Sequence, residues 1–480
     1  MNKKTNAGIR RLRPIKQQNV KRNTKLKPTR NAAPHIKRTK KKHPPKKRMV
    51  LKQKLRLKKN IKKKSKPKKR MVLKQKLRLK KIIINKPKPK KRMIFKKKKA
   101  KPKKRVIKPI TQLVPLRFST PHPKLNTILI EPEPDKMISA PQLGRILHTP
   151  VNPAGQMSTQ ATSLQKLGLP VSFCSYVKRG RFAFPDGLPS PIHKVPKSLR
   201  GRAMMNYAIK SSEKYQIFHF HGGETFTKYN YTDLPYLNLT NKRIVMSFWG
   251  SEVRKASIAK LMNPFARVKL TDENEIHRRL TVLSKFVDAV IVPDHELFEY
   301  IKGYFKKAYL VRAVVDHRKF SPLYPDANNQ RPLVVHAPSN RYIKGTDHIG
   351  RVVKTLKQNL NFDYVQVENT SNANVLKWIR KADILVDQLH LGIYGTVAIE
   401  AMLLGKPVIS HIREDLLTKY PANMPVVPAN PLTFEKALYN LITNPQLRYE
   451  LGVRGRAYAA EHHDPMKIAQ QLITVYKSLD

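Results

Sequence analysis

The sequence predicts an α/β protein of two consecutive domains, preceded by a long basic arm. Three observations predict this class. First, the charge is divided unevenly, because 51 of the 99 Lys and Arg residues precede position 121 and the first acidic residue is Glu131. Second, apolar strands alternate with helical stretches after that point, as in parallel sheets with right-handed crossovers. Third, this alternation begins again after a polar stretch at residues 326–331.

The arm, residues 1–118, contains those 51 cations and no acidic residue. Self-repulsion and a shortage of apolar side chains predict that it is disordered. Residues 45–59 are repeated without change at 67–81, and a degenerate third copy starts at Pro89, so the spacing is 22 residues. Each copy has too few apolar side chains to bury a face on its neighbour, and the repeat therefore does not predict a solenoid.

Lys outnumbers Arg in the arm, and Phe95 is the only Phe, Tyr or Trp before position 118. Base stacking and bidentate guanidinium contacts are therefore scarce, which argues against sequence-specific reading of nucleic acid. We expect non-specific, salt-dependent attraction to a polyanion, whether anionic lipid, wall polymer or nucleic acid. The alternative is a solvated tail, produced by repeat expansion, that has no discrete ligand.

Prolines punctuate residues 119–142, which we expect to link the arm to a first domain at 143–325. A second domain is expected at 326–465, and a last helix at 466–480. The single cysteine, Cys174, cannot form an intramolecular disulfide and suits a reducing compartment. No apolar run approaches the ~18 residues that a membrane helix needs. The expected location is cytoplasmic, with attachment to a membrane or an anionic polymer layer left open.

In the first domain, a strand at 145–148 is followed by a small-residue loop and a helix at 159–167. Such a loop presents backbone N–H groups, and Gly155 is its expected turn residue. His219 and His221 end a strand at 215–221, and their i, i+2 spacing puts them on one face. No further cluster of metal-ligand type accompanies them, so no metal site is predicted, and a structural role for each is as well founded as a functional one. The other expected elements are strands at 171–173, 243–249, 287–292 and 309–315, and a helix at 295–302 capped by Asp294.

The second domain repeats the same alternation over about 130 residues. Its first strand starts at Pro332 and leads into a loop that contains Lys344 and Gly345. The elements expected after that loop are helices at 346–358, 373–382 and 396–404, and strands at 362–367, 383–386 and 406–410.

Five features follow one another along residues 143–480. They are PAGQM at 153–157, Val315-Asp316 with Phe320-Ser321-Pro322, the loop Asn340 to Gly345, GIYGTVAIEAMLLGKPVIS at 392–410, and the final helix. In this order they resemble the retaining glycosyltransferases of family 4, which have the GT-B fold, and the motif at 392–410 is the most specific of them. The resemblance implies two Rossmann-like domains that face a cleft, the first for the acceptor and the second for a nucleotide-sugar donor.

The resemblance implies a donor site on the second domain. The leaving diphosphate needs stabilisation by a metal or by fixed cations, and no Asp-x-Asp metal site is evident. Lys344 and Arg341 are therefore the candidate phosphate ligands, supported by the N-terminus of the helix that starts at Thr396. Glu400 corresponds to the motif glutamate that holds the donor ribose. No cofactor is expected beyond the nucleotide sugar as co-substrate, and the predicted donor-binding residues are Asn340, Arg341, Lys344, Gly395, Thr396 and Glu400.

Two departures from the family pattern affect the predicted catalytic residues. Gly392 stands where the family has the first glutamate of E-x7-E, and Asp387 is the candidate replacement for that carboxylate. Trp249 stands where many members have a histidine, and His219 and His221 are the candidates for that polar role. The predicted catalytic set is therefore His219, His221 and Asp387, without a covalent nucleophile. The predicted acceptor-side residues are Gly155, Gln156, Trp249 and Glu252.

The predicted function is retaining, metal-independent transfer of a sugar from a nucleotide donor to a glycan or another hydroxyl acceptor. We expect this reaction in the synthesis of a cell-surface, spore or wall polysaccharide. Gly392 and the arm motivate an alternative, a non-catalytic carbohydrate- or polyanion-binding protein on a glycosyltransferase-derived fold. A principal role in nucleic-acid binding is a third option.

Overall fold

The computed structural model describes residues 125–134, 143–177, 185 and 187–479 of the 480-residue chain. The basic arm and its repeats lie outside the described residues, and so do the parts of the predicted linker at 119–124 and 135–142. The chain divides into two units, residues 1–106 and 107–480. All described elements belong to the second unit.

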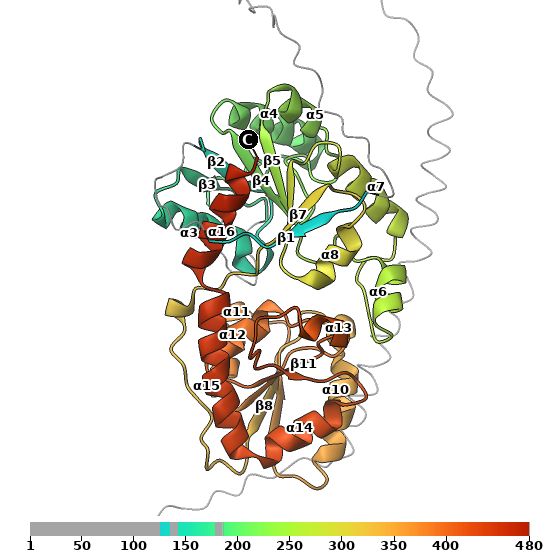
Figure 1. Cartoon of the computed structure of the whole chain (residues 1–480), viewed down its shortest axis with the longest axis vertical. Coiled ribbons are helices and arrows are strands. Elements are labelled where there is room, and N and C mark those ends of the chain that lie inside the picture. Colours follow the sequence, from blue (N-terminus) through green and yellow to red (C-terminus); the bar gives the residue numbers. More distant parts are fainter. Residues whose placement is uncertain (1–124, 135–142, 178–184, 186, 480) are drawn as a thin grey trace, which may run out of the picture. The chain divides into compact units, whose positions relative to one another are not determined.

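A seven-stranded parallel sheet forms the first α/β half of this unit (Figure 1). Strand β6 (Ala289–Val292) lies near its middle and is buried along its whole length. Its uninterrupted AVIV sequence fits that place, because both faces of a parallel sheet are covered. The strand order is β1-β7-β6-β5-β4-β2-β3, with β1 Ile128–Ile130, β2 Ile146–Thr149, β3 Val171–Phe173, β4 Ile217–His221, β5 Arg243–Ser247 and β7 Lys307–Leu310.

Helices connect the strands of this first sheet. The side chain of Asp294 accepts a hydrogen bond from the backbone N–H of Leu297 at 2.8 Å, so the predicted cap of the helix that starts at His295 is confirmed. Gly155 adopts a φ of 79° at the start of α3, a left-handed conformation that suits glycine and confirms the predicted turn. The helices are α3 Gln156–Lys166, α4 Arg200–Ser212, α5 Leu234–Leu239, α6 Ala256–Met262, α7 Glu273–Leu283 and α8 His295–Ile301.

A five-stranded parallel sheet, in the order β12-β11-β10-β8-β9, forms the second half. Its central strand β10 pairs with β8 and β11, and all three of its residues are buried. The strands are β8 Leu333–His336, β9 Asp363–Gln366, β10 Ile384–Val386, β11 Val408–Ser410 and β12 Val427–Pro428. The helices are α9 Arg341–Lys344, α10 Thr346–Leu356, α11 Asn372–Lys381, α12 Thr396–Leu403, α13 Glu414–Leu417, α14 Phe434–Thr443 and α15 Pro445–His462.

The last helix, α16 (Pro465–Lys477), returns to the first sheet and lies beside α3 (Figure 1). Its apolar face includes Leu472 and Tyr476, which join one buried cluster with Ile146 and Ile217 of the first sheet. The predicted fold class, two consecutive parallel α/β domains, is confirmed by the two sheets. No helix among the described residues is both long and apolar enough to cross a membrane.

Several predicted boundaries are wrong. Residues 119–142 were expected to be a linker, yet Ile128–Ile130 form β1, which pairs with β7 at the edge of the first sheet. A three-residue strand carries no detectable periodicity, and its partner lies far away in the sequence. Strand β7 ends at Leu310, whereas the apolar run predicted an end at Val315. Also not predicted were the α-helices α4, α5, α6, α7, α9, α13, α14 and α15 and the strand β12.

Candidate functional site

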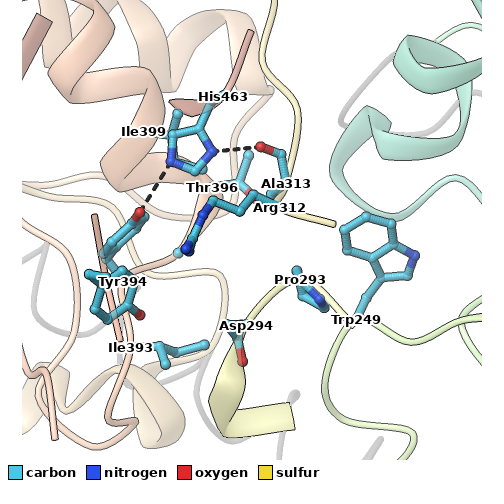
Figure 2. A pocket seen from close by; sticks show the side chains of 12 residues that line it. Trp249, Pro293, Asp294, Arg312, Ala313, Ile393, Tyr394, Thr396, Ile399 and His463 are labelled. Carbon is cyan, nitrogen blue, oxygen red and sulfur yellow. Dashed lines mark hydrogen bonds between the residues drawn. The ribbon is translucent and has the colours of Figure 1, made fainter. Parts of the chain in front are cut away.

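A pocket opens where three strands of the first sheet end and where α12 of the second half begins (Figure 2). Polar and apolar side chains alternate around it, as in a site that orients a ligand with a few polar groups. Trp249 follows β5, Asp294 follows β6, and Arg312 follows β7. The lining residues are Trp249, Pro293, Asp294, Arg312, Ala313, Ile393, Tyr394, Gly395, Thr396, Ile399, Tyr420 and His463.

The N-terminus of α12 contributes backbone donors to this pocket. The helix begins at Thr396, as predicted, and its N-cap Gly395 makes no side-chain cap hydrogen bond. The first N–H groups of a helix have no partner within the helix, and they carry the positive end of its dipole. Because Gly395 and Thr396 both line the pocket, this end of α12 can bind an anion there.

Lys344 and Asp387 form an ion pair next to the start of α12. The ammonium Nζ of Lys344 lies 2.6 Å from Oδ1 of Asp387, and the two side chains are 13% and 0% exposed. The other oxygen of Asp387 accepts a hydrogen bond from the backbone N–H of Gly395 at 2.7 Å. Lys344 is therefore not a solvated surface lysine. Asp387 holds the loop before α12, and its predicted role at the sugar stays a prediction.

Glu400 lies one turn into α12, facing inward. It is 8% exposed, and its Oε1 accepts one hydrogen bond, at 3.3 Å, from the side-chain amide of Asn372. Burial raises the pKa of this carboxyl to about 7. A buried carboxylate with a single weak donor can accept further hydrogen bonds, such as those of ribose hydroxyls. The predicted ribose contact stays a prediction.

Two further residues predicted to bind the nucleotide-sugar donor, Arg341 and Asn340, already form contacts with other protein groups. The guanidinium of Arg341 pairs with Asp347 at 2.9 Å and with Glu368 at 3.0 Å, and its side chain is 53% exposed. The side chain of Asn340 caps α9 by accepting a hydrogen bond from the backbone N–H of Ile343 at 3.1 Å. Neither residue lines the pocket, and Lys344, Asp387 and Glu400 do not line it either. Among the predicted cations, Lys344 lies nearer to it, because a Cβ on Gly395 would be 3.1 Å from the Lys344 ammonium.

The space beside Gly392 is filled by Arg413. A Cβ at position 392 would lie 2.2 Å from Cγ of Arg413 and 2.6 Å from its Cδ. The Arg413 guanidinium is held by Asp415, with Nε 2.9 Å from Oδ1. A glutamate at position 392 would therefore need Arg413 to move.

The predicted acceptor-side residues do not all reach the pocket. Trp249 lines it, and its backbone N–H donates a hydrogen bond to the carboxylate of Glu252. Gln156 is 1% exposed, and its amide forms two hydrogen bonds, of 2.8 and 3.0 Å, with the backbone of Val314. Gly155 is buried at the start of α3. Gln156 therefore anchors the segment after β7, and a direct contact of these two residues with an acceptor stays a prediction.

His219 and His221 lie on one face of β4, as predicted, with ring centroids 4.4 Å apart and nearly parallel. Both side chains are 0% exposed, and neither lines the pocket. His148 of β2 is the Cα partner of His219 and joins the pair, with its Nδ1 3.1 Å from Nε2 of His221. The sequence analysis did not find His148, because parallel pairing brings it close from 71 residues away.

The three imidazoles belong to a continuous chain of hydrogen bonds. Trp249 Nε1, which can only donate, lies 3.4 Å from His221 Nδ1 and therefore sets the direction. His221 then donates from Nε2 to His148 Nδ1, and His148 donates from Nε2 to the Tyr476 hydroxyl at 3.0 Å. Tyr476 donates to His219 Nδ1 at 2.7 Å, and His219 donates from Nε2 to Ser247 Oγ at 2.7 Å.

This chain is consistent with three neutral histidines, because each ring donates once and accepts once. Burial lowers the pKa of His148 to about 3 and lowers the pKa of His219 and His221 well below 6.5. Ligand atoms of the three rings lie within 4.8 Å of one another, which is close enough to hold a metal ion. Each of the six ring nitrogens already has a protein partner, so a metal would have to displace this chain. A catalytic role of His219 and His221 stays a prediction.

Two pocket residues, His463 and Arg312, were missed by the sequence analysis. His463 Nδ1 donates to the carbonyl of Ala313 at 2.6 Å, and its Nε2 accepts from the Tyr394 hydroxyl at 3.1 Å (Figure 2). It thus connects the segment after β7 with the loop before α12. Arg312 follows β7 and is half-buried. No local sequence pattern could have identified either residue, because the pocket is formed by segments that are far apart in the sequence.

No protein-family model matches the sequence, and no curated protein shows a significant match. Among solved structures, the chain is similar to sucrose-phosphate synthase from Thermosynechococcus elongatus, with 14% identity and a TM-score of 0.48, over 70% of this chain and 98% of that chain. It is also similar to Anabaena HepE in complex with UDP-glucose, with 12% identity and a TM-score of 0.45, over 70% of this chain and 100% of that chain. A glycosyltransferase from Rickettsia africae matches with 13% identity and a TM-score of 0.45, over 70% of this chain and 98% of that chain.

Proposed function

We propose that the chain is a glycosyltransferase that transfers a sugar from a nucleotide donor bound at α12. The observation that carries this proposal is the start of α12 in the pocket, with the Lys344–Asp387 pair beneath it and the buried Glu400 one turn beyond. A nucleoside diphosphate needs donors for its phosphates and an acceptor for its ribose hydroxyls. The helix N-terminus and Lys344 supply the first, and Glu400 supplies the second.

We further propose retention of configuration without a metal ion, as the family resemblance implies. Negative charge on the departing diphosphate would be stabilised by backbone N–H groups and cations, which are fixed before the reaction. The acceptor is a glycan or another hydroxyl compound, and the product belongs to a cell-surface, spore or wall polysaccharide. His219, His221 and Asp387 remain the candidate catalytic side chains, with Asp387 as the proposed replacement for the carboxylate that contacts the donor sugar.

The test is a donor panel of UDP-, GDP- and ADP-sugars, in which release of the nucleoside diphosphate is measured. We expect turnover of at least one donor and its loss in Lys344→Ala and Glu400→Ala. Lys354→Ala and Glu435→Ala, at exposed positions of α10 and α14, are the matched controls. If no donor is bound or turned over, or if the site variants match the wild type, the proposal is wrong.

A second candidate function is favoured by the missing carboxylate at Gly392 and the Arg413 stem beside it. This alternative is a non-catalytic protein that binds carbohydrate or a polyanion on a glycosyltransferase-derived fold. Glycan binding without donor turnover would support it. The stereochemistry of the product, read from its anomeric proton signals, distinguishes retention from inversion if turnover occurs.

For the basic arm we propose non-specific binding to a polyanion, either anionic lipid, wall polymer or nucleic acid. Its 51 cations without an acidic residue support this proposal. Binding to DNA and to anionic vesicles should fall steeply as salt rises, because counterions are released on binding. Binding that does not respond to salt would contradict it.

A further inference from the structure

We propose that Arg312 binds the diphosphate of the nucleotide donor as a cation supplied by the first α/β half. The inference rests on the proposed function, since it names a further contact of the same donor. Arg312 lines the pocket together with Gly395 and Thr396 at the start of α12. Its side chain extends toward Tyr394 (Figure 2).

Arg312 has no carboxylate partner within ion-pair distance. A charge that is partly removed from water is normally paired, because its desolvation is otherwise uncompensated. Arg312 forms no ion pair and no hydrogen bond with any residue that the structure describes. Other cations of the described residues do have carboxylate partners, among them Lys344 with Asp387, Arg341 with Asp347 and Glu368, Arg413 with Asp415, and Arg254 with Glu296.

The surroundings of Arg312 strengthen the attraction of its charge for an anion. Its guanidinium carbon lies 5.9 Å from the ring centroid of Tyr420, and Pro293 and Ile393 form apolar walls of the same pocket. Apolar walls lower the local dielectric and so increase the field of an unpaired charge. Asp294 also lines the pocket, and its Oδ1 caps α8. Burial raises the pKa of its carboxyl to about 6, which the charge of Arg312 partly offsets, so Asp294 interacts with Arg312 electrostatically without forming an ion pair with it.

A diphosphate is the anion that this arrangement suits. The start of α12 offers N–H groups to one side of the pocket, and the planar guanidinium can donate two parallel hydrogen bonds to phosphate oxygens. The two cationic elements come from different halves, since Arg312 follows β7 of the first sheet and α12 belongs to the second. A bound diphosphate would therefore connect both halves of the protein.

The test measures the affinity of the full-length protein for UDP, ADP and GDP by calorimetry, with the parent nucleosides as uncharged probes. The variants are Arg312→Gln and Arg312→Lys, and Arg454→Gln on the exposed face of α15 is the control. We expect Arg312→Gln to weaken binding of the preferred nucleoside diphosphate about tenfold or more, with a smaller loss for Arg312→Lys. Nucleoside binding should not change.

The melting temperature of the ligand-free protein separates this role from a structural one. Because Arg312 has no described ion-pair or hydrogen-bond partner, Arg312→Gln should melt close to the wild-type temperature or above it. A diphosphate affinity within twofold of wild type in Arg312→Gln, while Lys344→Ala weakens it, would overturn the Arg312 proposal and leave the proposed function standing. If the wild type binds none of the three diphosphates, the proposed function itself fails.

Discussion

The polar residues at the ends of the two sheets are used differently. In the first half, three histidines, Tyr476 and Ser247 are completely buried, and they satisfy one another's hydrogen bonds. In the second half, Glu400 has one long hydrogen bond and the start of α12 opens into a pocket. A polar cluster whose hydrogen-bonding groups all have partners stabilises the fold, whereas a cluster with unused hydrogen-bonding groups can bind a ligand. Residue type alone does not distinguish the two.

The largest expected loss of stability comes from breaking the Lys344–Asp387 ion pair. Lys344→Met leaves the fully buried carboxylate without its cation, and we expect a loss of about 3 kcal/mol in the free energy of unfolding. The double variant Lys344→Met/Asp387→Asn should recover most of this loss, since the amide oxygen can still accept from Gly395. Urea denaturation of the three proteins measures it. Equal stability of the single and double variants would show that the pair is not coupled.

Glu400 should make stability depend on pH in the sense opposite to the three buried histidines, whose lowered pKa values make stability fall as pH drops below 6.5. Burial raises the pKa of the Glu400 carboxyl from 4.5 to about 7, so its contribution is complete below pH 4.5 and is lost as pH rises through 7. Glu400→Gln should therefore gain stability relative to the wild type between pH 5 and 8, by up to roughly 3 kcal/mol. Denaturation curves across this pH range show whether Glu400→Gln is more stable than the wild type and whether the difference grows with pH. A constant difference would mean that Glu400 titrates normally.

A glutamate at position 392, where the resembled family has one, tests whether Arg413 leaves room for that side chain. Gly392→Glu should cost about 1–3 kcal/mol, because the new side chain overlaps the Arg413 stem. Gly392→Glu/Arg413→Ala removes that overlap and should be more stable than the single variant. Both are compared by thermal denaturation. A single variant as stable as the wild type would show that Arg413 moves aside without cost.

The smallest expected effect belongs to the histidine chain. Tyr476→Phe removes the hydroxyl between His148 and His219, and we expect a loss of about 1–2 kcal/mol, nearly independent of pH above 5. Tyr309→Phe, which removes only the contact with Ser478 Oγ, is the control and should cost less. Urea denaturation at two pH values measures both. If the tyrosine variants are equally stable, the chain does not stabilise the fold.

The sequence by itself determined the class of the fold and much of the second half. Apolar runs and glycines are local signals, and they located α12, Gly395 and the inward-facing Glu400. It also predicted that Asp294 caps α8. These features depend on neighbours within a few residues, so the local sequence is sufficient to define them.

Only the tertiary structure decided which polar residues meet. His148 reaches His219 through strand pairing, Arg413 fills the space beside Gly392, and Arg312 enters the pocket after β7. Each of these contacts joins segments that are distant in the sequence, and no periodicity records such a contact. The free energy of burying and pairing these groups is a property of the packed molecule. Polar residues are therefore hydrogen-bonded to one another throughout the histidine chain of the first half, whereas Glu400 of the second half can accept further hydrogen bonds.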